Sequence, residues 1–291
     1  MDTSAFGRSS LGRSSFSRSS LSRDDLDAYC ERIGHPGVRE ADAGTLRALH
    51  HAHVHAFPFE NLDPVRGVVP SLAPADLMAK LVRGRRGGYC FEQNTLFAEV
   101  LVALGFRVTR LAARVVLGAA RAEDRPLTHM ALLVEAPGDP RPQLADVGFG
   151  APGAPLEPVP TAPGEPSGAG RRHRLVRVPS DGPLELWSLE FRTEDAWQAQ
   201  YVFTLAPFAR PDFEVANWYV ATHPRSPFRR RPRVLRLIPD GGHLLLDGRR
   251  LVRAGADGRV VERELTGEAE VRRICAQEFG IDVPEGTVLP D

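Results

Sequence analysis

Three residue types that together can activate a thiol occur in order along the chain. Cys90 follows the glycine pair Gly87 and Gly88, and His129 and Asp146 come downstream. A histidine can take the proton of a cysteine, and an aspartate bonded to that histidine fixes its tautomer and stabilises its cation. The order therefore predicts a thiol nucleophile and, with it, acyl transfer through a thioester.

The elements expected to hold these residues would fix their positions. Apolar residues crowd most of the surface of a predicted buried helix from Cys90 to Leu104, and Gly105 supplies its C-terminal stop. Cys90 would then lie in the first turn, where backbone N–H groups and the helix dipole stabilise negative charge by about 0.3–1 kcal/mol. His129 begins a predicted strand and Asp146 ends another, so both side chains would project from fixed elements.

The same cysteine also has a purely structural interpretation. Cysteine is among the most buried residue types, and Cys, His and Asp can be found in this order in most chains. The position of Cys90 at a helix start and the glycine pair before it support the catalytic interpretation, so that the two interpretations have equal support.

The composition excludes several classes of protein. The 291 residues are 42% hydrophobic, and 37 basic residues balance 37 acidic ones, so no global field favours nucleic acid or a membrane surface. Arginine nearly replaces lysine throughout. The three cysteines (Cys30, Cys90 and Cys275) have no disulfide-framework spacing, which favours a reducing compartment. No apolar run approaches the roughly 18 residues of a membrane span and no secretion signal is evident, so we expect the cytoplasm.

The N-terminal residues form a short repeat. Between residues 4 and 23 an apolar residue, a small residue, Arg and two Ser recur every five residues. A period of five suits neither a helix face nor a strand face, and the low hydrophobicity favours a disordered tail.

The order of the expected elements indicates an α+β fold. Helical spacing predicts helices at about 22–33, from Thr45 to before Pro58, and at 74–82. Strands are then expected at 107–117, 129–135, 143–147, 173–178, 184–191 and 201–205, with a loop-rich passage over 137–170. A mixed end follows, with helices at 214–219 and 268–279 and a hairpin over 243–252 that turns at Asp247 and Gly248. Helices, then strands, then a mixed end are typical of α+β proteins rather than alternating βαβ units.

Several sequence blocks, taken together, carry a family resemblance. The blocks are 55–62 (His-Ala-Phe-Pro-Phe-Glu-Asn-Leu), 86–92 (Arg-Gly-Gly-Tyr-Cys-Phe-Glu) with Asn94, 128–129 (Thr-His), 146–150 (Asp-Val-Gly-Phe-Gly), 217–219 (Asn-Trp-Tyr), 222–224 (Thr-His-Pro) and 226–228 (Ser-Pro-Phe). Their number and order resemble the arylamine N-acetyltransferase family, over about residues 26–252 or beyond.

The resemblance implies a papain-like cysteine-triad fold in three parts. These are a helical N-terminal domain that carries the nucleophile, a β-barrel domain that carries His129 and Asp146, and an α/β lid. With the tail, the expected boundaries are 1–23, 24–106, 107–207 and 208–291.

The resemblance also implies a reaction and its substrates. Acetyl-CoA would acetylate Cys90, CoA would leave, and an arylamine, hydrazine or N-hydroxyarylamine would take the acetyl group in a ping-pong sequence. Phe149 would line the acceptor pocket, and we also expect Gly148 and Phe57 to contact substrate. Glu60 and Arg86 would form a structural ion pair beneath the site, a bidentate pairing that suits arginine.

One departure from the family pattern concerns the binding residues. Residues 151–153 (Ala-Pro-Gly) follow the Val-Gly-Phe-Gly run, where the family often has another glycine or a basic residue. The family pattern therefore does not assign the residues that line the acceptor pocket or the path by which CoA enters. Arg225 and residues 229–231 are candidates for the CoA phosphates, although an arginine run is more often a solvated face.

Three other functions remain as alternatives. An amide synthase that closes a macrolactam from a carrier-bound polyketide thioester would use the same triad, and the G+C-rich style of the sequence fits a secondary-metabolite producer. A non-catalytic binding relative of the fold is disfavoured by the intact Cys, His and Asp positions. A papain-like protease or a transglutaminase has no support outside the triad.

A cluster of four histidines invites a metal interpretation. Of His50, His51, His53 and His55, only His50 and His53 would share a helix face, and no acidic or cysteine ligand sits at zinc-motif spacing. We therefore expect no metal and no prosthetic group. The oligomeric state is not indicated by the sequence.

Overall fold

The computed structural model describes residues 19–35, 40–139, 141–162, 172–239 and 241–287. Most of the repeat predicted as a disordered tail lies outside these residues. The described chain begins at residue 19, before the expected end of that tail at residue 23. There Ser20 donates its backbone N–H to the Glu99 side chain at 3.2 Å. The first helix begins at Arg23, and Ser22 and Asp25 form the capping box that the sequence predicts.

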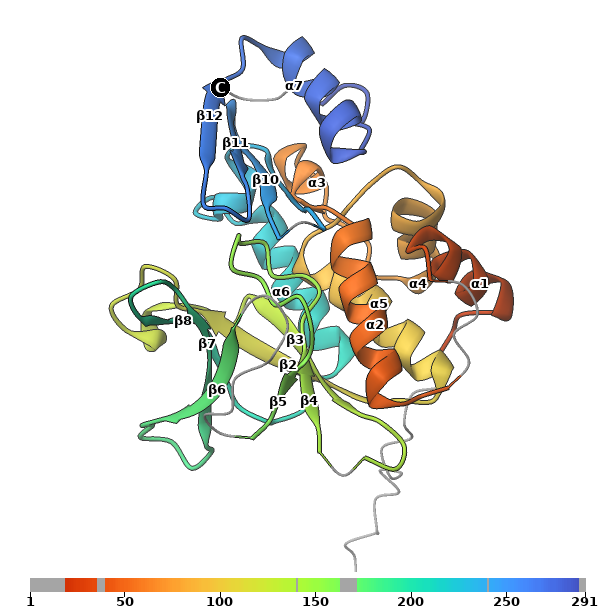
Figure 1. The fold of residues 1–291 in the computed structure, drawn as a ribbon, viewed down its shortest axis with the longest axis vertical. Coiled ribbons are helices and arrows are strands. Elements are labelled where there is room, and N and C mark those ends of the chain that lie inside the picture. The colour runs from red at the N-terminus through yellow and green to blue at the C-terminus, as the bar shows by residue number, and fades with distance from the viewer. Residues whose placement is uncertain (1–18, 36–39, 140, 163–171, 240, 288–291) are drawn as a thin grey trace, which may run out of the picture.

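Helices make up the first part of the fold (Figure 1). They are α1 (Arg23–Arg32), α2 (Ala43–Ala56), α4 (Pro74–Leu77), the π-helical turn η1 (Met78–Arg83) and α5 (Cys90–Leu104). The second helix starts two residues before the predicted cap at Thr45, because the side chain of Asp42 accepts from the Thr45 amide and caps it instead. The continuous helix predicted over 74–82 is present, but its second half has π winding.

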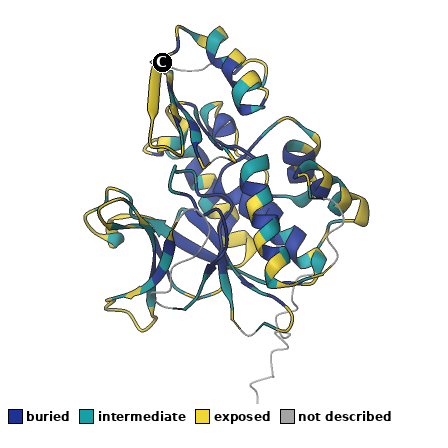
Figure 2. Ribbon diagram, in the orientation of Figure 1, coloured by how far each residue is buried: buried dark blue, intermediate teal, exposed yellow. Residues whose placement is uncertain are grey.

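The helix α5 has the bounds that its apolar residues predict. It runs from Cys90 to Leu104 and ends at Gly105, whose φ of +99° is the left-handed conformation expected of a glycine stop. Most of its residues are buried, and Figure 2 shows this buried region at the centre of the molecule. The nucleophile candidate therefore begins a helix that is held on several sides.

The second part is a seven-stranded antiparallel sheet with strand order β5-β4-β3-β2-β8-β7-β6. Its strands are β2 (Arg107–Val115), β3 (His129–Glu135), β4 (Gln143–Ala145), β5 (Val159–Pro160), β6 (His173–Val178), β7 (Leu186–Arg192) and β8 (Trp197–Phe203), with a short turn η2 (Ala122–Asp124) between β2 and β3. The edge strands β5 and β6 lie beside each other, so the sheet is a nearly closed barrel (Figure 1). The β3 bounds were predicted correctly, whereas β5 lies in a passage predicted as loop.

The third part is a five-stranded antiparallel sheet with helices. It contains α6 (Arg210–Thr222), η3 (Pro227–Arg229), β9 (Arg233–Leu237), β10 (His243–Asp247), β11 (Arg250–Ala254), β12 (Val260–Glu264), α7 (Glu268–Ile274) and the π-helical turn η4 (Cys275–Phe279). The predicted hairpin is β10–β11, but its turn is one residue later than expected, because Asp247 pairs with Arg250 and Gly248 takes a φ of +65°. The strand β12 was not predicted, and it is exposed along its length (Figure 2).

An early strand ties the first part of the chain to the last. The strand β1 (Phe59–Glu60) pairs with β9 across Phe59 and Leu235, and the short helix α3 (Leu62–Val65) follows it. The side chain of Leu62 belongs to the small C-terminal core with Val234 and Leu246. The segment that precedes the nucleophile is therefore anchored to the third part of the fold, although sequence order places it in the first.

The main hydrophobic core extends across all three parts of the fold. It joins the inner faces of the helices to the inner face of the barrel, and Phe213 and Val220 of α6 also belong to it. In Figure 1 the helix α6 lies between the helical part and the barrel. This core fixes α5 against β2 and β3, the elements expected to carry the reacting groups.

Candidate active site

A cleft of about 910 Å³ lies where the three parts of the fold meet. Cys90 of α5 and His129 of β3 line it, as do Phe149 from the loop after β4 and Phe228 from η3. A pocket of this size, lined by aromatic rings and a few polar groups, is the usual form of a small-molecule site.

Cys90 is the first residue of α5 and is 5% exposed. Its sulfur lies 3.8 Å from the carbonyl oxygen of Thr128, the residue before His129. As the first residue of α5, Cys90 lies at the end of the helix where the backbone N–H groups have no partner within the helix.

The glycine pair before Cys90 is required by space. A Cβ atom at Gly87 would lie 2.0 Å from the carbonyl oxygen of Pro58, and one at Gly88 would lie 3.0 Å from three atoms of the Glu92 side chain. Neither glycine has a positive φ. Gly87 therefore permits a close approach to the chain just before β1, and Gly88 leaves room for the Glu92 side chain of α5.

His129 and Asp146 are in direct contact. The Nε2 atom of His129 lies 2.7 Å from Oδ2 of Asp146, and both residues are buried. Burial alone would lower the pKa of His129, but the charge and hydrogen bond of Asp146, together with contact with Cys90, raise it to about 10. The imidazole is therefore held as a cation at neutral pH.

Asp146 is held by three groups besides His129. Its Oδ1 atom accepts from Nδ2 of Asn94 at 2.9 Å and from the Gly148 amide at 3.0 Å. Its own amide donates to Nε2 of His50 at 3.2 Å. Burial tends to raise the pKa of Asp146, but His129 and these donors outweigh it, so the pKa lies below its usual value.

Asn94 connects the elements that carry the three residues. Its Nδ2 atom also donates to the carbonyl of Met130 on β3 at 2.8 Å, and its Oδ1 accepts from the Val147 amide at 3.0 Å. One side chain of α5 therefore bonds to both the strand that carries His129 and the loop that carries Asp146.

The expected ion pair between Glu60 and Arg86 is in contact, but its geometry is not a fork. Both Nε and Nη2 of Arg86 approach the same oxygen of Glu60, at 2.8 and 2.7 Å, and Nη2 also lies 3.1 Å from Asp63. The second oxygen of Glu60 accepts from the Leu62 amide at 2.7 Å. The pair therefore joins the segment before Cys90 to the start of α3.

Comparison with known proteins identifies the chain. Residues 42–288 match the sequence model of an N-acetyltransferase family. The arylamine N-acetyltransferase of Mycolicibacterium smegmatis is 41% identical over 266 residues, which cover 89% of this chain and 92% of the relative. The chain belongs to the arylamine N-acetyltransferase family. It is therefore an acetyltransferase.

Solved structures of the same family have the same fold. The arylamine N-acetyltransferase of Nocardia farcinica superposes with a TM-score of 0.84 at 41% identity, covering 92% of each chain. That of Mycobacterium marinum in complex with CoA gives a TM-score of 0.81 at 36% identity and covers 89% of this chain and 93% of its own. The α+β, papain-like organisation expected from the sequence is thus the fold of this acetyltransferase.

Two of the three residues expected to contact substrate in this acetyltransferase line the cleft. Gly148 and Phe149 do so, and the Phe149 ring lies 5.5 Å from the ring of His129. Phe57 is not among the lining residues, because it ends α2 and its ring packs into the helical core, 4.6 Å from that of His53. Phe59, two residues later, lines the cleft instead.

The histidine cluster divides into two pairs. His50 and His53 are buried on the core side of α2, as expected from their shared face, and burial lowers their pKa values to about 4 and about 3. Among the described residues, no group of three or more His, Cys, Asp or Glu is arranged to hold a metal ion. Nor does the described part of the chain contain a helix with the length and apolar character to cross a membrane.

Sequence reasoning missed several residues of the site. His50 was interpreted only as part of a histidine-rich helix, and Tyr201, whose ring lies 4.9 Å from that of His129, carried no signal. The helical spacing of His50 with Leu46 and Leu49 could have indicated a buried, hydrogen-bonded histidine.

Proposed function

We propose that this enzyme carries an acetyl group from acetyl-CoA as a thioester on Cys90 and passes it to an arylamine, hydrazine or N-hydroxyarylamine. The observation that carries the proposal is the position of Cys90 at the start of α5, open to the cleft and next to the bonded pair of His129 and Asp146. Such an arrangement suits a nucleophile, a proton carrier and an orienting carboxylate.

In the first half-reaction the sulfur of Cys90 attacks the acetyl carbonyl carbon of acetyl-CoA. The bond from that carbon to the CoA sulfur then breaks, and the CoA sulfur takes a proton from the His129 cation. Because the pKa of His129 is raised to about 10, its ring carries that proton at neutral pH. The products are the Cys90 thioester, neutral His129 and CoA with a free thiol.

In the second half-reaction the nitrogen of the amine, or the oxygen of an N-hydroxyarylamine, attacks the thioester carbonyl. Neutral His129 takes the proton that this atom loses, and Cys90 leaves as a thiolate. The contribution of the Cys90 charge to the His129 pKa disappears while the sulfur is acetylated, which favours the neutral base at this step. Asp146 keeps the ring oriented in both halves.

The lining of the cleft supports separate places for the two substrates. Phe59, Phe149 and Phe228 offer ring faces near Cys90 that suit an aromatic acceptor. Arg225 and Arg231 line the same cleft, and we assign them to the CoA phosphates because guanidinium groups bind phosphate well.

The mechanism also bears on the compartment. Cys90 must stay reduced to accept an acetyl group, which fits the cytoplasm better than an oxidising compartment. We therefore propose that the enzyme acts in the cytoplasm. We propose small-molecule substrates as its only partners.

The proposal is tested by mixing the protein with acetyl-CoA and a panel of arylamines and hydrazines while free CoA is measured. We expect turnover with several acceptors, none with Cys90→Ala, and one acetyl group on Cys90 by mass spectrometry in the absence of acceptor. Undiminished turnover in Cys90→Ala would contradict the proposal. Acetylation of Cys90 without transfer to any acceptor would instead favour the amide synthase.

A further inference from the structure

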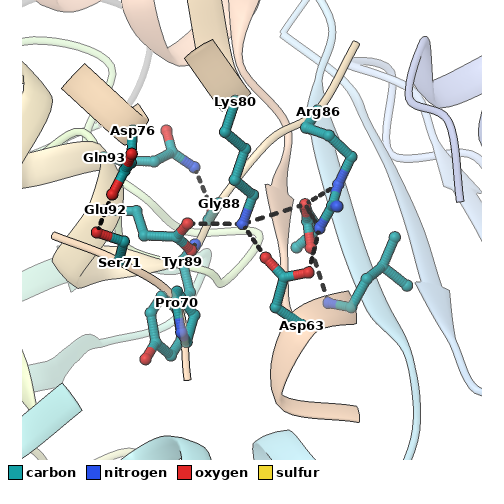
Figure 3. Close-up of polar contacts among 12 residues, drawn as sticks. Asp63, Pro70, Ser71, Asp76, Lys80, Arg86, Gly88, Tyr89, Glu92 and Gln93 are labelled. Atoms are coloured by element: carbon teal, nitrogen blue, oxygen red, sulfur yellow. Dashed lines mark hydrogen bonds and ion pairs between the residues drawn. The ribbon is translucent and has the colours of Figure 1, made fainter. Parts of the chain in front are cut away.

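One lysine stands out in a chain that otherwise uses arginine. Of the 37 lysine and arginine residues in the sequence, only Lys80 is lysine. Its ammonium nitrogen lies 2.6 Å from Oδ2 of Asp63, 2.6 Å from Oε1 of Glu92 and 3.9 Å from Oε1 of Glu60, at the centre of the group in Figure 3. The side chain is 18% exposed, and the proposed reaction makes no use of it.

The shape of the group explains why a lysine is present. The three carboxylates come from α3, α5 and β1 and converge on a single nitrogen atom. A lysine ammonium is a compact charge with three rotatable donors, whereas an arginine guanidinium is a planar fork that suits one carboxylate at a time. Arg86, the other cation of the group, places Nη2 2.7 Å from Glu60 and 3.1 Å from Asp63.

Glu92 links this charge to the nucleophile. It is the third residue of α5, and while Oε1 bonds Lys80, Oε2 accepts from the Tyr89 amide at 3.1 Å. Tyr89 immediately precedes Cys90 and is the N-cap of the helix. A carboxylate that accepts from the cap amide fixes the first turn of a helix.

Burial works against the charge on Glu92. Its side chain is 1% exposed, and burial raises its pKa to about 7 even though Lys80 pulls it down, with Glu60 and Asp63 adding to the rise. Without Lys80 the carboxyl would be protonated throughout the neutral range, because an opposite charge within about 4–6 Å lowers a carboxyl pKa by about 1–3 units. A protonated Glu92 is a weaker acceptor for the Tyr89 amide.

We propose that Lys80 is a positioning residue for the nucleophile. Its ammonium lets Glu92 ionise within the neutral range and keeps it turned toward the Tyr89 amide, and this capping bond holds Cys90 in the first turn of α5. The inference rests on the proposed role of Cys90. It adds that a residue outside the cleft, Lys80, helps to hold Cys90 in position.

Other charges around the group do not replace this support. Arg86 is engaged by Glu60 and Asp63, and Arg66 lies 3.4 Å from Asp63. Neither contacts Glu92. The Tyr89 hydroxyl donates to Asn217 of α6, so the remaining polar group of the cap residue faces away from the ion cluster.

The test is the rate at which iodoacetamide alkylates Cys90, measured from about pH 6 to 9, with the modified residue identified by mass spectrometry. In Lys80→Met we expect the acidic limb of the profile to move up by about 1–3 pH units, with about a tenfold lower rate near pH 7. The matched control is Arg83→Met, which removes a cation from the same π-helical turn, 51% exposed and paired with Asp25. Its profile should match that of the unaltered protein.

A second variant separates positioning from a loss of folding. In Lys80→Met/Glu92→Gln the amide oxygen at residue 92 can accept from Tyr89, and Glu60 and Asp63 keep their contacts with Arg86, so neither carboxylate loses its last cation. We expect the rate near pH 7 to recover to within about threefold of the unaltered protein. Thermal melts of all variants report folding separately.

The outcomes are distinct. An unchanged profile in Lys80→Met, or a double variant no faster than Lys80→Met, would overturn the inference. Alkylation spread evenly over Cys30, Cys90 and Cys275 in the unaltered protein would contradict the nucleophile role itself. Selective alkylation of Cys90 needs neither acetyl-CoA nor an acceptor, so the test of Lys80 does not depend on the identity of the substrates.

Discussion

Gly148 lies so close to Cys90 that a Cβ atom on it would be 2.7 Å from the Cα atom of the cysteine. The same Cβ would also lie 2.9 Å from Nδ2 of Asn94. The loop that follows Asp146 is therefore pressed against the first turn of α5. Cys90 and Asp146 can lie this close together because residue 148, between them, has no side chain.

The first prediction concerns this contact. Gly148→Ala should push the Asp146 loop away from α5 and lower kcat/KM by about 100-fold, because a shift of about 1 Å at a reacting centre can cost that much. The matched control is Gly182→Ala, since a Cβ at Gly182 would meet only Ser180, at 3.6 Å. Steady-state kinetics with acetyl-CoA and one arylamine measure both. Equal activity of the two variants would contradict the tight contact.

The second prediction concerns His50, which supports Asp146 from behind. Burial lowers the pKa of His50 to about 4, so its Nε2 atom has a lone pair for the Asp146 amide at neutral pH. His50→Leu leaves that amide buried without an acceptor and should lower the free energy of unfolding by about 1–3 kcal/mol. It should also lower kcat/KM, while His50→Gln keeps an acceptor and retains more of both.

The control for His50 is its neighbour on the exposed face of α2. His51→Gln should leave stability and activity unchanged, because the His51 side chain is exposed. Urea denaturation and steady-state kinetics measure all three variants. A His50→Leu protein as stable and active as His50→Gln would show that the bond to Asp146 has no role in positioning.

The parts of the site that the sequence predicts are those set by local patterns. The apolar residues of α5 and its terminal Gly105 predict both ends of the helix, and this places Cys90 in the first turn. The strand that begins at His129 is predicted as well, because a short apolar run between loops is typical of a buried strand. Each of these predictions needs information from only about 15 neighbouring residues.

The parts that the sequence does not predict depend on pairing between distant segments. The two residues of β1 are too few for any period, and their partner β9 lies far along the chain. The strand β12 has no buried face and therefore no alternation of apolar and polar residues. The contact between Lys80 and Glu92 depends on how a π-helical turn packs on α5, which charge patterning does not reveal.

The third prediction concerns the ion pair beneath the site. Glu60→Ala removes the buried partner of Arg86 and the acceptor of the Leu62 amide, and should lower the free energy of unfolding by about 3–5 kcal/mol. The matched control is Glu262→Ala, which breaks the exposed pair with Arg250 on β11 and β12 and should cost far less, because solvent screens that pair. Urea denaturation measures both. Similar losses in the two variants would contradict a structural role for Glu60.

The last prediction concerns the pH dependence of stability that Glu92 causes. Burial, only partly offset by Lys80, raises its pKa from 4.5 to about 7, so between these values the folded protein holds a proton that the unfolded chain has lost. A raised pKa contributes stability below the unfolded value, and this contribution is lost as pH rises through the folded one. The unaltered protein should therefore lose up to about 3 kcal/mol of unfolding free energy, relative to Glu92→Gln, between about pH 4.5 and 7.

The comparison between the two proteins isolates this effect. All other titrating groups are shared, so their contributions largely cancel when the unfolding free energy of Glu92→Gln is subtracted from that of the unaltered protein at each pH. Urea denaturation at about pH 5 and pH 7.5 gives the two differences. Since Glu92 loses its proton in this interval, the difference must become less favourable to the unaltered protein as pH rises. A constant difference would mean that the Glu92 carboxyl is already charged at pH 5, and that Lys80 offsets the whole effect of burial.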